Sequence, residues 1–218
     1  MKIKNYKNIN VSIMIKAIVF DLGGVLFAEG KSVASEKLAK KYNYDKEVIF
    51  KILTSPESKD LRKGLISDKE FWDWARNNLP EGYDAYLIKK EWYEGYLLDN
   101  DIFNLIKRLK GKYKLVAFSG NIKSRVEFLD EKYDFRIYFD IEIYSFDYHL
   151  NKPDKRFIEG MVKKTNLKPE EIVYIDDSEE YVLLAKKMGL NALAYSQGRI
   201  KRLKKELKEL GVKFPNFF

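Results

Sequence analysis

The chain has 218 residues, of which 45% are hydrophobic, 15% aromatic and 34% charged. This length and composition are typical of a globular protein with one large domain, and they exclude disordered and fibrous chains. The chain has no cysteine, which excludes disulfides, thiol catalysis and cysteine metal ligands. Its single histidine, His149, makes a histidine-based zinc site or a serine-histidine triad improbable.

The formal net charge is +8, so an acidic partner has to be considered. The lysines and arginines gather near both ends, while the middle of the chain is mixed in sign. Such a distribution is more typical of a solvated helix face than of a nucleic-acid site. No apolar segment near the start is long enough for a membrane span or a signal peptide. We expect a cytoplasmic protein with an N-terminal extension at residues 1–14; nothing in the sequence indicates its oligomeric state.

The first apolar run of strand length covers residues 16–20, and the following stretch differs from the rest of the chain. From residue 27 to about residue 100 the spacing of apolar residues is helical, with no convincing strand. The clearest helical patterns cover 33–44, 46–53, 67–79 and 85–98. About 70 residues are far more than a crossover between two strands needs. The sequence therefore predicts a helical insert at 29–98 in a core formed by 15–28 and 99–218.

The later part of the chain alternates between strands and helices. Apolar runs predict strands at 114–118, 136–144, 171–175 and 190–195. Helical spacing predicts helices at 121–133, 153–166 and 178–189. This order favours a Rossmann-like α/β core, in which helices cover both faces of a parallel sheet.

Chemically useful side chains follow the ends of several predicted strands. In an open parallel sheet, the carboxyl ends of the strands form the ligand-binding edge. The residues that should meet there are Asp21, Ser119 with Gly120 and Asn121, Lys152, and the adjacent pair Asp176 and Asp177. We interpret these residues as the active site of a phosphoryl-transfer reaction.

The carboxylates suit a nucleophile beside a hard cation. Asp21, together with Asp176 or Asp177, could hold Mg²⁺, which prefers oxygen ligands and keeps positions for water and substrate phosphate. Asp21 could then attack phosphorus in line and form an aspartyl-phosphate that water cleaves. For one ion to be shared, the carboxylates of Asp21 and Asp177 must approach within about 5 Å.

The remaining groups suit the phosphoryl oxygens. The hydroxyl of Ser119 and the backbone N–H groups that follow Asp21, including that of Gly24, could donate hydrogen bonds to phosphate. Gly120 and Asn121 continue the Ser119 turn and are candidate substrate contacts. Lys152 would compensate the charge of the phosphate and the carboxylates.

The order of four motifs resembles that of the haloacid dehalogenase-like (HAD) hydrolase superfamily. The motifs are DLGGV, a strand that ends in SGN, NKPD, and IVYIDDSEE, and the helical insert resembles a C1 cap. The resemblance spans roughly residues 15–195. It implies that Asp21 is the nucleophile and a metal ligand, with the main-chain carbonyl of Gly23 as a second ligand. It also implies a phosphate contact for Ser119, charge compensation by Lys152, and Asp177, alone or with Asp176, as the remaining ligand of Mg²⁺.

Each of these residues also has a plain structural interpretation. Asp21, Ser119 and the acidic pair could merely cap helices, and Lys152 could be a solvated loop lysine. Two adjacent acids at a strand end are costly without a cation, which favours the functional interpretation of Asp176 and Asp177. His149 is more readily explained as a polar residue at a strand end than as a catalyst.

Two positions depart from the pattern of the family. Most of its phosphatases carry an acid two residues after the nucleophile, where this chain has Gly23, and they usually have Asn or Asp at the position of Tyr181. General acid-base catalysis is worth about 10² to 10⁴-fold in rate. The missing acid favours a substrate with a good leaving group, such as an anomeric or acyl phosphate. The insert could supply help to the attacking water, with Glu29, Arg62 and Lys63 as candidates.

Three functions remain open from the sequence. The first is Mg²⁺-dependent hydrolysis of a small phosphorylated metabolite, with closure of the insert over the site. The second is 2-haloacid dehalogenation, which gains nothing from the acid pair at Asp176 and Asp177. The third is a catalytically degenerate protein that only binds a phosphorylated ligand.

Overall fold

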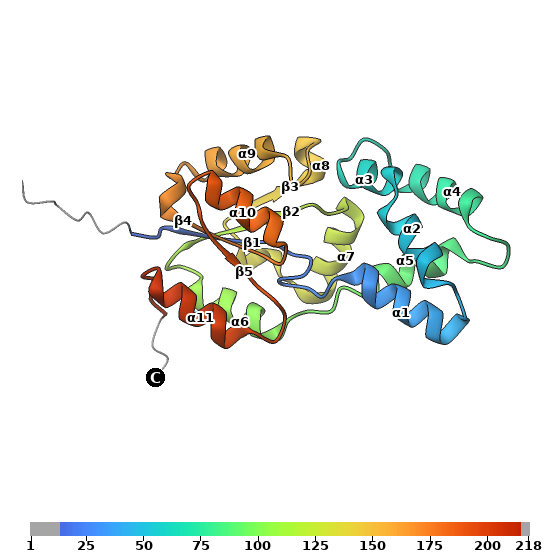
Figure 1. Cartoon of the computed structure of the whole chain (residues 1–218), viewed down its shortest axis with the longest axis horizontal. Helices are drawn as coiled ribbons and strands as arrows, with labels where there is room; N and C mark the ends of the chain where they lie inside the picture. The colour runs from blue at the N-terminus through green and yellow to red at the C-terminus, as the bar shows by residue number, and fades with distance from the viewer. Residues whose placement is uncertain (1–13, 215–218) are drawn as a thin grey trace, which may run out of the picture.

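A five-stranded parallel sheet forms the centre of the computed structural model, which describes residues 14–214 (Figure 1). The order of the strands is β3-β2-β1-β4-β5. They are β1 (Ala17–Phe20), β2 (Lys114–Ser119), β3 (Ile141–Tyr144), β4 (Ile172–Asp176) and β5 (Asn191–Ala194). The predicted Rossmann-like α/β architecture is confirmed. The expected extension at residues 1–14 lies outside the described residues except for Met14, which is exposed.

Eleven α-helices and two short 3₁₀ turns surround the sheet in the described part of the chain. The helices before β2 are α1 (Gly30–Tyr42), α2 (Lys46–Thr54), α3 (Pro56–Arg62), α4 (Asp68–Asn78), α5 (Ala85–Glu94) and α6 (Asn100–Leu109). Those after β2 are α7 (Lys123–Tyr133), α8 (Ser145–Tyr148), α9 (Lys155–Thr165), α10 (Glu179–Lys187) and α11 (Ile200–Glu209). Across residues 14–214 no helix combines the length and apolarity that a membrane span requires.

The central strand β1 is buried on both faces, which explains its continuous apolar sequence. Ile18 and Phe20 belong to a large hydrophobic cluster on one face, while Ala17 and Val19 belong to a second cluster on the other. Helices α9 and α10 cover the second face, and α6 and α11 cover the first (Figure 1). The sheet is therefore the middle layer of three.

Strand pairing brings the motif residues to one edge. Phe20 is in register with Ala117 of β2 and with Ile175 of β4. Asp21 comes directly after Phe20, and its backbone N–H donates to the carbonyl of Ile175 at 3.0 Å. The carboxyl ends of β1, β2 and β4 are thus neighbours, as the sequence predicts.

The third strand is shorter than expected. The apolar run 136–144 predicts one strand, but a 3₁₀ turn occupies Arg136–Tyr138 and only Ile141–Tyr144 pairs with β2. Phe135 and Phe139 are buried in the cluster under the sheet, so the apolar character of this run serves packing before the strand begins. Periodicity alone does not separate these two uses of apolar residues.

Helices α1–α5 lie together beside the carboxyl edge of the sheet (Figure 1). Apolar periodicity predicts four of these helices but not α3, whose seven residues are too few for a clear helical period. Two chain segments connect this group of helices to the sheet. They run side by side, with Ala28 N–H donating to Leu97 O at 2.7 Å and Asp99 N–H donating to Leu26 O at 2.8 Å.

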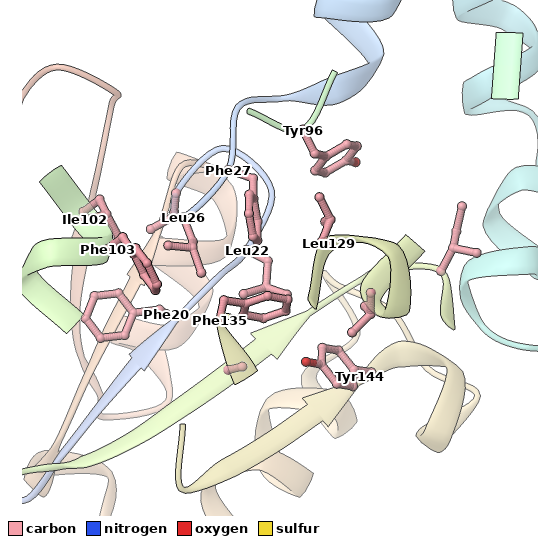
Figure 2. Close-up of a cluster of buried hydrophobic side chains, with 14 of the residues drawn as sticks. Phe20, Leu22, Leu26, Phe27, Tyr96, Ile102, Phe103, Leu129, Phe135 and Tyr144 are labelled. Atoms are coloured by element: carbon pink, nitrogen blue, oxygen red, sulfur yellow. The ribbon is translucent and has the colours of Figure 1, made fainter. Parts of the chain in front are cut away.

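The loop after β1 is held by apolar side chains. Leu22, Leu26 and Phe27 are fully buried and point into the cluster that also contains Phe20 and Phe135 (Figure 2). The loop closes on itself, because Phe27 N–H donates to Leu22 O at 2.8 Å. This anchoring fixes the backbone that follows Asp21.

Candidate functional site

Asp21 lies at the carboxyl end of β1 and is only 7% exposed. One carboxylate oxygen, Oδ1, accepts a hydrogen bond from the N–H of Leu22 at 2.8 Å. The other, Oδ2, lies 2.9 Å from Nζ of Lys152. The carboxylate is thus held in one orientation by its own loop and by a lysine from a distant segment.

Lys152 is buried between two carboxylates. Its Nζ lies 2.9 Å from Oδ2 of Asp21 and 2.6 Å from Oδ2 of Asp176, and it approaches the hydroxyl of Tyr174 at 3.3 Å. Burial alone would lower the pKa of Lys152, but the two carboxylates outweigh it and hold the pKa well above the usual value. Lys152 therefore carries a permanent positive charge at the centre of the site.

Asp21, Asp176 and Asp177 form an acidic cluster. Each offers one carboxylate oxygen, and these oxygens all lie within 4.8 Å of one another. The separation of Asp21 and Asp177 meets the distance of about 5 Å that a shared Mg²⁺ requires. The sequence-based expectation about this distance is confirmed.

The two adjacent acids have different surroundings. Asp176 is fully buried, and its Oδ2 contacts Lys152 and the Tyr174 hydroxyl, while its Oδ1 accepts from the N–H of Ser178 at 2.9 Å. Asp177 is more exposed and lines the cavity. Asp177 is therefore the more accessible of the pair, and Asp176 holds Lys152 in place.

The charge of the cluster is incompletely balanced. The pKa of Asp21 is raised to about 7, because burial, Asp176 and Asp177 together outweigh the opposing effect of Lys152. Partial removal from water, together with Asp176, raises the pKa of Asp177 to about 6. Three carboxylates face one lysine, so a divalent cation with oxygen ligands would balance the remaining charge. The donor set thus fits Mg²⁺.

Gly24 allows Asp177 to reach this cluster. Its φ is +82°, and a Cβ at this position would lie 2.2 Å from Cγ of Asp177. Neither the backbone conformation nor the space admits another residue without a shift. The second glycine of DLGGV therefore has a steric cause at the site.

The second and third motifs form the floor of a cavity. Ser119, Gly120, Asn121 and Asn151 all line it. A Cβ on Gly120 would lie 2.1 Å from Oδ1 of Asn151, so this glycine makes room for the NKPD segment. Oδ1 of Asn121 accepts from the N–H of Ile122 and from Nε of Arg125, which leaves its amide nitrogen for other contacts.

The cavity has a volume of about 240 Å³ and a second wall formed by the helical segment and its connections. Glu29, Lys31, Arg62 and Tyr96 belong to this wall, and Tyr181 closes the side near Lys152. Lys31 and Tyr96 were not predicted from the sequence. Lys31 stands in an ordinary stretch of α1, and Tyr96 is one of 15 tyrosines, so no local signal distinguishes them.

Tyr96 lies close to the position where the acid is missing. A Cβ on Gly23 would lie 3.4 Å from Cε1 of Tyr96 and 3.9 Å from its hydroxyl. Burial raises the pKa of Tyr96. A longer side chain at position 23 would therefore extend toward the ring of Tyr96.

Two other candidates lie outside this cavity. His149 and Lys63 line a neighbouring cavity, where Nδ1 of His149 lies 2.9 Å from the carbonyl oxygen of Lys63. His149 thus connects α8 to the end of α3. Of the three helper residues suggested for Gly23, only Glu29 and Arg62 line the cavity that contains Asp21.

A model of the haloacid dehalogenase-like hydrolase family matches residues 15–189. The chain is a member of this family. Its hydrolase class follows from that membership, and the order of the motifs agrees with the parallel strand ends described above. One cavity of this HAD-like hydrolase is lined by residues of all four motifs, including Asp21, Ser119, Lys152 and Asp177, and Gly23 stands in place of the usual acid. Asp176 is fully buried and does not line the cavity.

Two curated relatives cover most of the chain. An uncharacterized protein of Dictyostelium discoideum is 41% identical over 217 residues and shares 86% of this chain and 94% of its own length. Enolase-phosphatase E1 of a Hydrogenobaculum strain is 27% identical, over 85% of this chain and 93% of its own.

Solved HAD structures share the fold. An enzyme of Bacteroides thetaiotaomicron, in complex with magnesium and inorganic phosphate, has a TM-score of 0.72 at 23% identity, over 85% of this chain and 96% of its own. The L-2-haloacid dehalogenase of Xanthobacter autotrophicus has a TM-score of 0.64 at 19% identity, and the match covers 90% of this chain and 83% of the dehalogenase. Both phosphate-binding and dehalogenase relatives therefore have this architecture, and the fold alone does not separate the two chemistries.

Proposed function

We propose that this HAD-like hydrolase is a Mg²⁺-dependent phosphatase of a small phosphorylated metabolite. The observation that carries the proposal is the cluster of Asp21, Asp176 and Asp177 with Lys152. Asp21, Asp177 and Lys152 line one cavity. A relative named as an enolase-phosphatase and a structural neighbour with magnesium and phosphate support it.

The proposed ligands of Mg²⁺ are Asp21, Asp177 and the main-chain carbonyl of Gly23, with Asp176 in reach of the same cluster. When bound, the ion would neutralise charge on the carboxylates and on the phosphate oxygens. Ser119, Gly120 and Asn121 are the proposed phosphate contacts. The N–H of Gly24, which the sequence also suggested, instead donates to the carbonyl oxygen of Phe27 at 2.7 Å and is not available for phosphate. Lys152 supplies the positive charge that remains with or without the metal.

Asp21 is the proposed nucleophile. Its Oδ2 would attack phosphorus, the phosphorus–oxygen bond to the leaving group would break, and an aspartyl-phosphate would form. Water would then attack phosphorus and release phosphate and the free carboxylate. Oδ1 stays fixed by the Leu22 N–H during this exchange, which holds the nucleophile in orientation.

Gly23 limits the proposed substrates to those with good leaving groups, such as anomeric or acyl phosphates. These need little protonation of the departing oxygen, so the loss of a general acid costs less. Glu29 is the carboxylate on the opposite wall, and we assign it the proton of the attacking water. Arg62 also lines the cavity, and its guanidinium offers only N–H donors, so it suits anion binding instead.

The helical group α1–α5 would act as the cap, with residues 29–98 as its bounds and 15–28 and 99–218 as the core. The paired connections at Ala28 to Leu97 and at Leu26 to Asp99 are the proposed hinge. Closure would exclude bulk water while Asp21 attacks the substrate, and opening would release the leaving group and admit the water that cleaves the aspartyl-phosphate.

The proposed function is tested by phosphate release with and without Mg²⁺. The panel contains glucose 1-phosphate, acetyl phosphate, 4-nitrophenyl phosphate, an alkyl phosphate and a nucleotide. We expect turnover of activated or anomeric phosphates that EDTA abolishes and Mg²⁺ restores. The absence of Mg²⁺-dependent release from every substrate, with chloride release from 2-chloropropionate, would instead support dehalogenation. Phosphate binding without either reaction would support the degenerate ligand-binding protein.

Replacement of Gly24 tests the metal site. Gly24→Ala should weaken Mg²⁺ binding about tenfold or more, because the new Cβ would displace Asp177. The positive φ should also cost about 1 kcal/mol of unfolding free energy. The measurement is the Mg²⁺-induced shift of the melting temperature together with calorimetric titration of Mg²⁺.

Gly82→Ala is the matched control. Gly82 has a φ of +84° and no atom within 4 Å of a Cβ, so it carries the same backbone cost without the collision. Its Mg²⁺ affinity should equal that of the wild type. Equal Mg²⁺ affinities in both variants would contradict the role assigned to Asp177.

A further inference from the structure

The cavity wall opposite the acidic cluster carries unbalanced positive charge. Lys31, near the start of α1, and Arg62, the last residue of α3, both line the cavity. Glu29 is the acid beside them, and its carboxylate lies 3.4 Å from Nζ of Lys31. Among the residues that line this cavity in the described part of the chain, no other acid stands on this wall.

Arg62 has no carboxylate partner among residues 14–214. Its Nε is buried without a hydrogen-bond partner. One of its two terminal nitrogens, Nη2, donates to the carbonyl oxygen of Leu53 at 3.3 Å. The guanidinium lies over the ring of Trp92, 5.7 Å from its centre. An arginine in such a position has N–H donors that can bind an anion.

A third cation stands behind this wall. Arg125 is fully buried, and its guanidinium lies 4.2 Å from the ring centre of Tyr96 and 4.6 Å from that of Trp92. Its Nε donates to Asn121, while its two terminal nitrogens have no partner in the described residues. Tyr96 therefore separates Arg125 from the cavity, and the positive charge of Arg125 still acts on Lys31 in the cavity wall.

The effect on Lys31 agrees with this arrangement. Partial burial lowers the pKa of Lys31, Glu29 opposes the change, and Arg62 and Arg125 add to it. A bound anion would relieve both the repulsion between these cations and the cost of their missing partners. The backbone of Arg62 is fixed in position, because the hydroxyl of Ser145 in α8 donates to the carbonyl oxygen of Arg62.

The positive surface continues outside the cavity. A neighbouring cavity of about 480 Å³ shares Arg62, Asn151, Lys152 and Tyr181 with the first. The further cations that line it are Lys59, Lys63 and Arg156, of which Arg156 is paired with Asp154 and Lys63 lies 3.6 Å from Asp60. Such a surface favours the approach of a ligand with several negative charges.

We propose that the substrate carries a second anionic group, a carboxylate or a second phosphate, which Lys31 and Arg62 bind while the scissile phosphate occupies the site at Asp21. This inference rests on the proposed function. A substrate of this kind is a small phosphorylated acid or a bisphosphate. Its two charged ends would contact opposite walls of the cavity, so the second group fixes the orientation of the first.

Non-hydrolysable ligands test this inference without turnover. Phosphonocarboxylates with one, two or three methylene groups are titrated into the full chain with Mg²⁺ by calorimetry, each beside the alkylphosphonate of the same length. At one or more lengths the phosphonocarboxylate should bind at least about tenfold more tightly, as expected for a charge-assisted contact. Titration of propane-1,3-diphosphonate in the same way tests whether the second group is a phosphate or a carboxylate.

The variants are Lys31→Met and Arg62→Met, with Lys40→Met as the control. Lys40 is exposed on the same helix as Lys31 and lines no described cavity. The first two should reduce the preference for the second anion, measured as the ratio of phosphonocarboxylate to alkylphosphonate affinity, to less than about threefold. Lys40→Met should keep the preference, and the melting temperatures of all variants check that they fold.

The outcomes separate the inference from the proposed function. Equal affinity for the phosphonocarboxylate and the alkylphosphonate at every length, or a preference that persists in both cavity variants, overturns the second anion site while the phosphatase assignment stands. Binding of neither ligand class overturns both. A preference that depends on Lys31 and Arg62 supports the site, and phosphate release from the panel above then decides the reaction independently.

Discussion

Asp21→Asn should lower Mg²⁺-dependent phosphate release by about 10⁴-fold or more, because loss of a nucleophile removes the covalent route. The amide has nearly the same shape as the carboxylate, and its oxygen can still accept from the Leu22 N–H. The variant should therefore fold. Initial rates on an activated phosphate such as 4-nitrophenyl phosphate, with circular dichroism as a check of folding, measure the effect.

The control is Asp134→Asn. Asp134 is exposed at the end of α7 in a left-handed conformation that asparagine also adopts. Its rate should equal that of the wild type. Asp21→Asn protein that retains a tenth or more of the wild-type rate would show that another group is the nucleophile.

Lys152→Met should be the most destabilising single change in the site. The substitution leaves Asp21 and Asp176 buried against each other without their counter-charge. Loss of one partner from a buried ion pair typically costs about 3 to 5 kcal/mol. Urea unfolding without metal measures this loss, and Mg²⁺ should recover part of it, because the ion restores positive charge to the cluster.

Lys155→Met is the matched control, since Lys155 is exposed at the start of the following helix α9. Its unfolding free energy should change by less than about 0.5 kcal/mol. If Lys152→Met does not fold, Lys152→Arg, which keeps the charge, provides the second variant and should retain more stability. A change below about 1 kcal/mol in Lys152→Met would mean that the carboxylates do not depend on this lysine.

The strand ends were predictable because each rests on a local pattern. A short apolar run followed by Asp21, Ser119 or the Asp176 and Asp177 pair identifies both the strand and its carboxyl end. The parallel order then places these ends at one edge, a general property of such sheets. Lys152 was predicted from a loop motif, but its burial between two carboxylates was not.

Other features required the folded chain. The run 136–144 has one apolar pattern for two purposes, a buried 3₁₀ turn and a strand, so its strand was predicted too long. Helix α3 was missed because its seven residues lie between two longer helices. Its last residue, Arg62, was suggested only as a helper for the attacking water.

The sequence by itself determined the α/β class, the helical insert and the identity of the motif residues, because apolar periodicity and strand-end chemistry are local properties. The tertiary structure decided the second wall of the cavity. Lys31, Arg62, Tyr96 and Arg125 come from four separate segments and meet only when the helices pack beside the sheet. Which charges face a substrate depends on such long-range contacts, and no spacing along one chain encodes them.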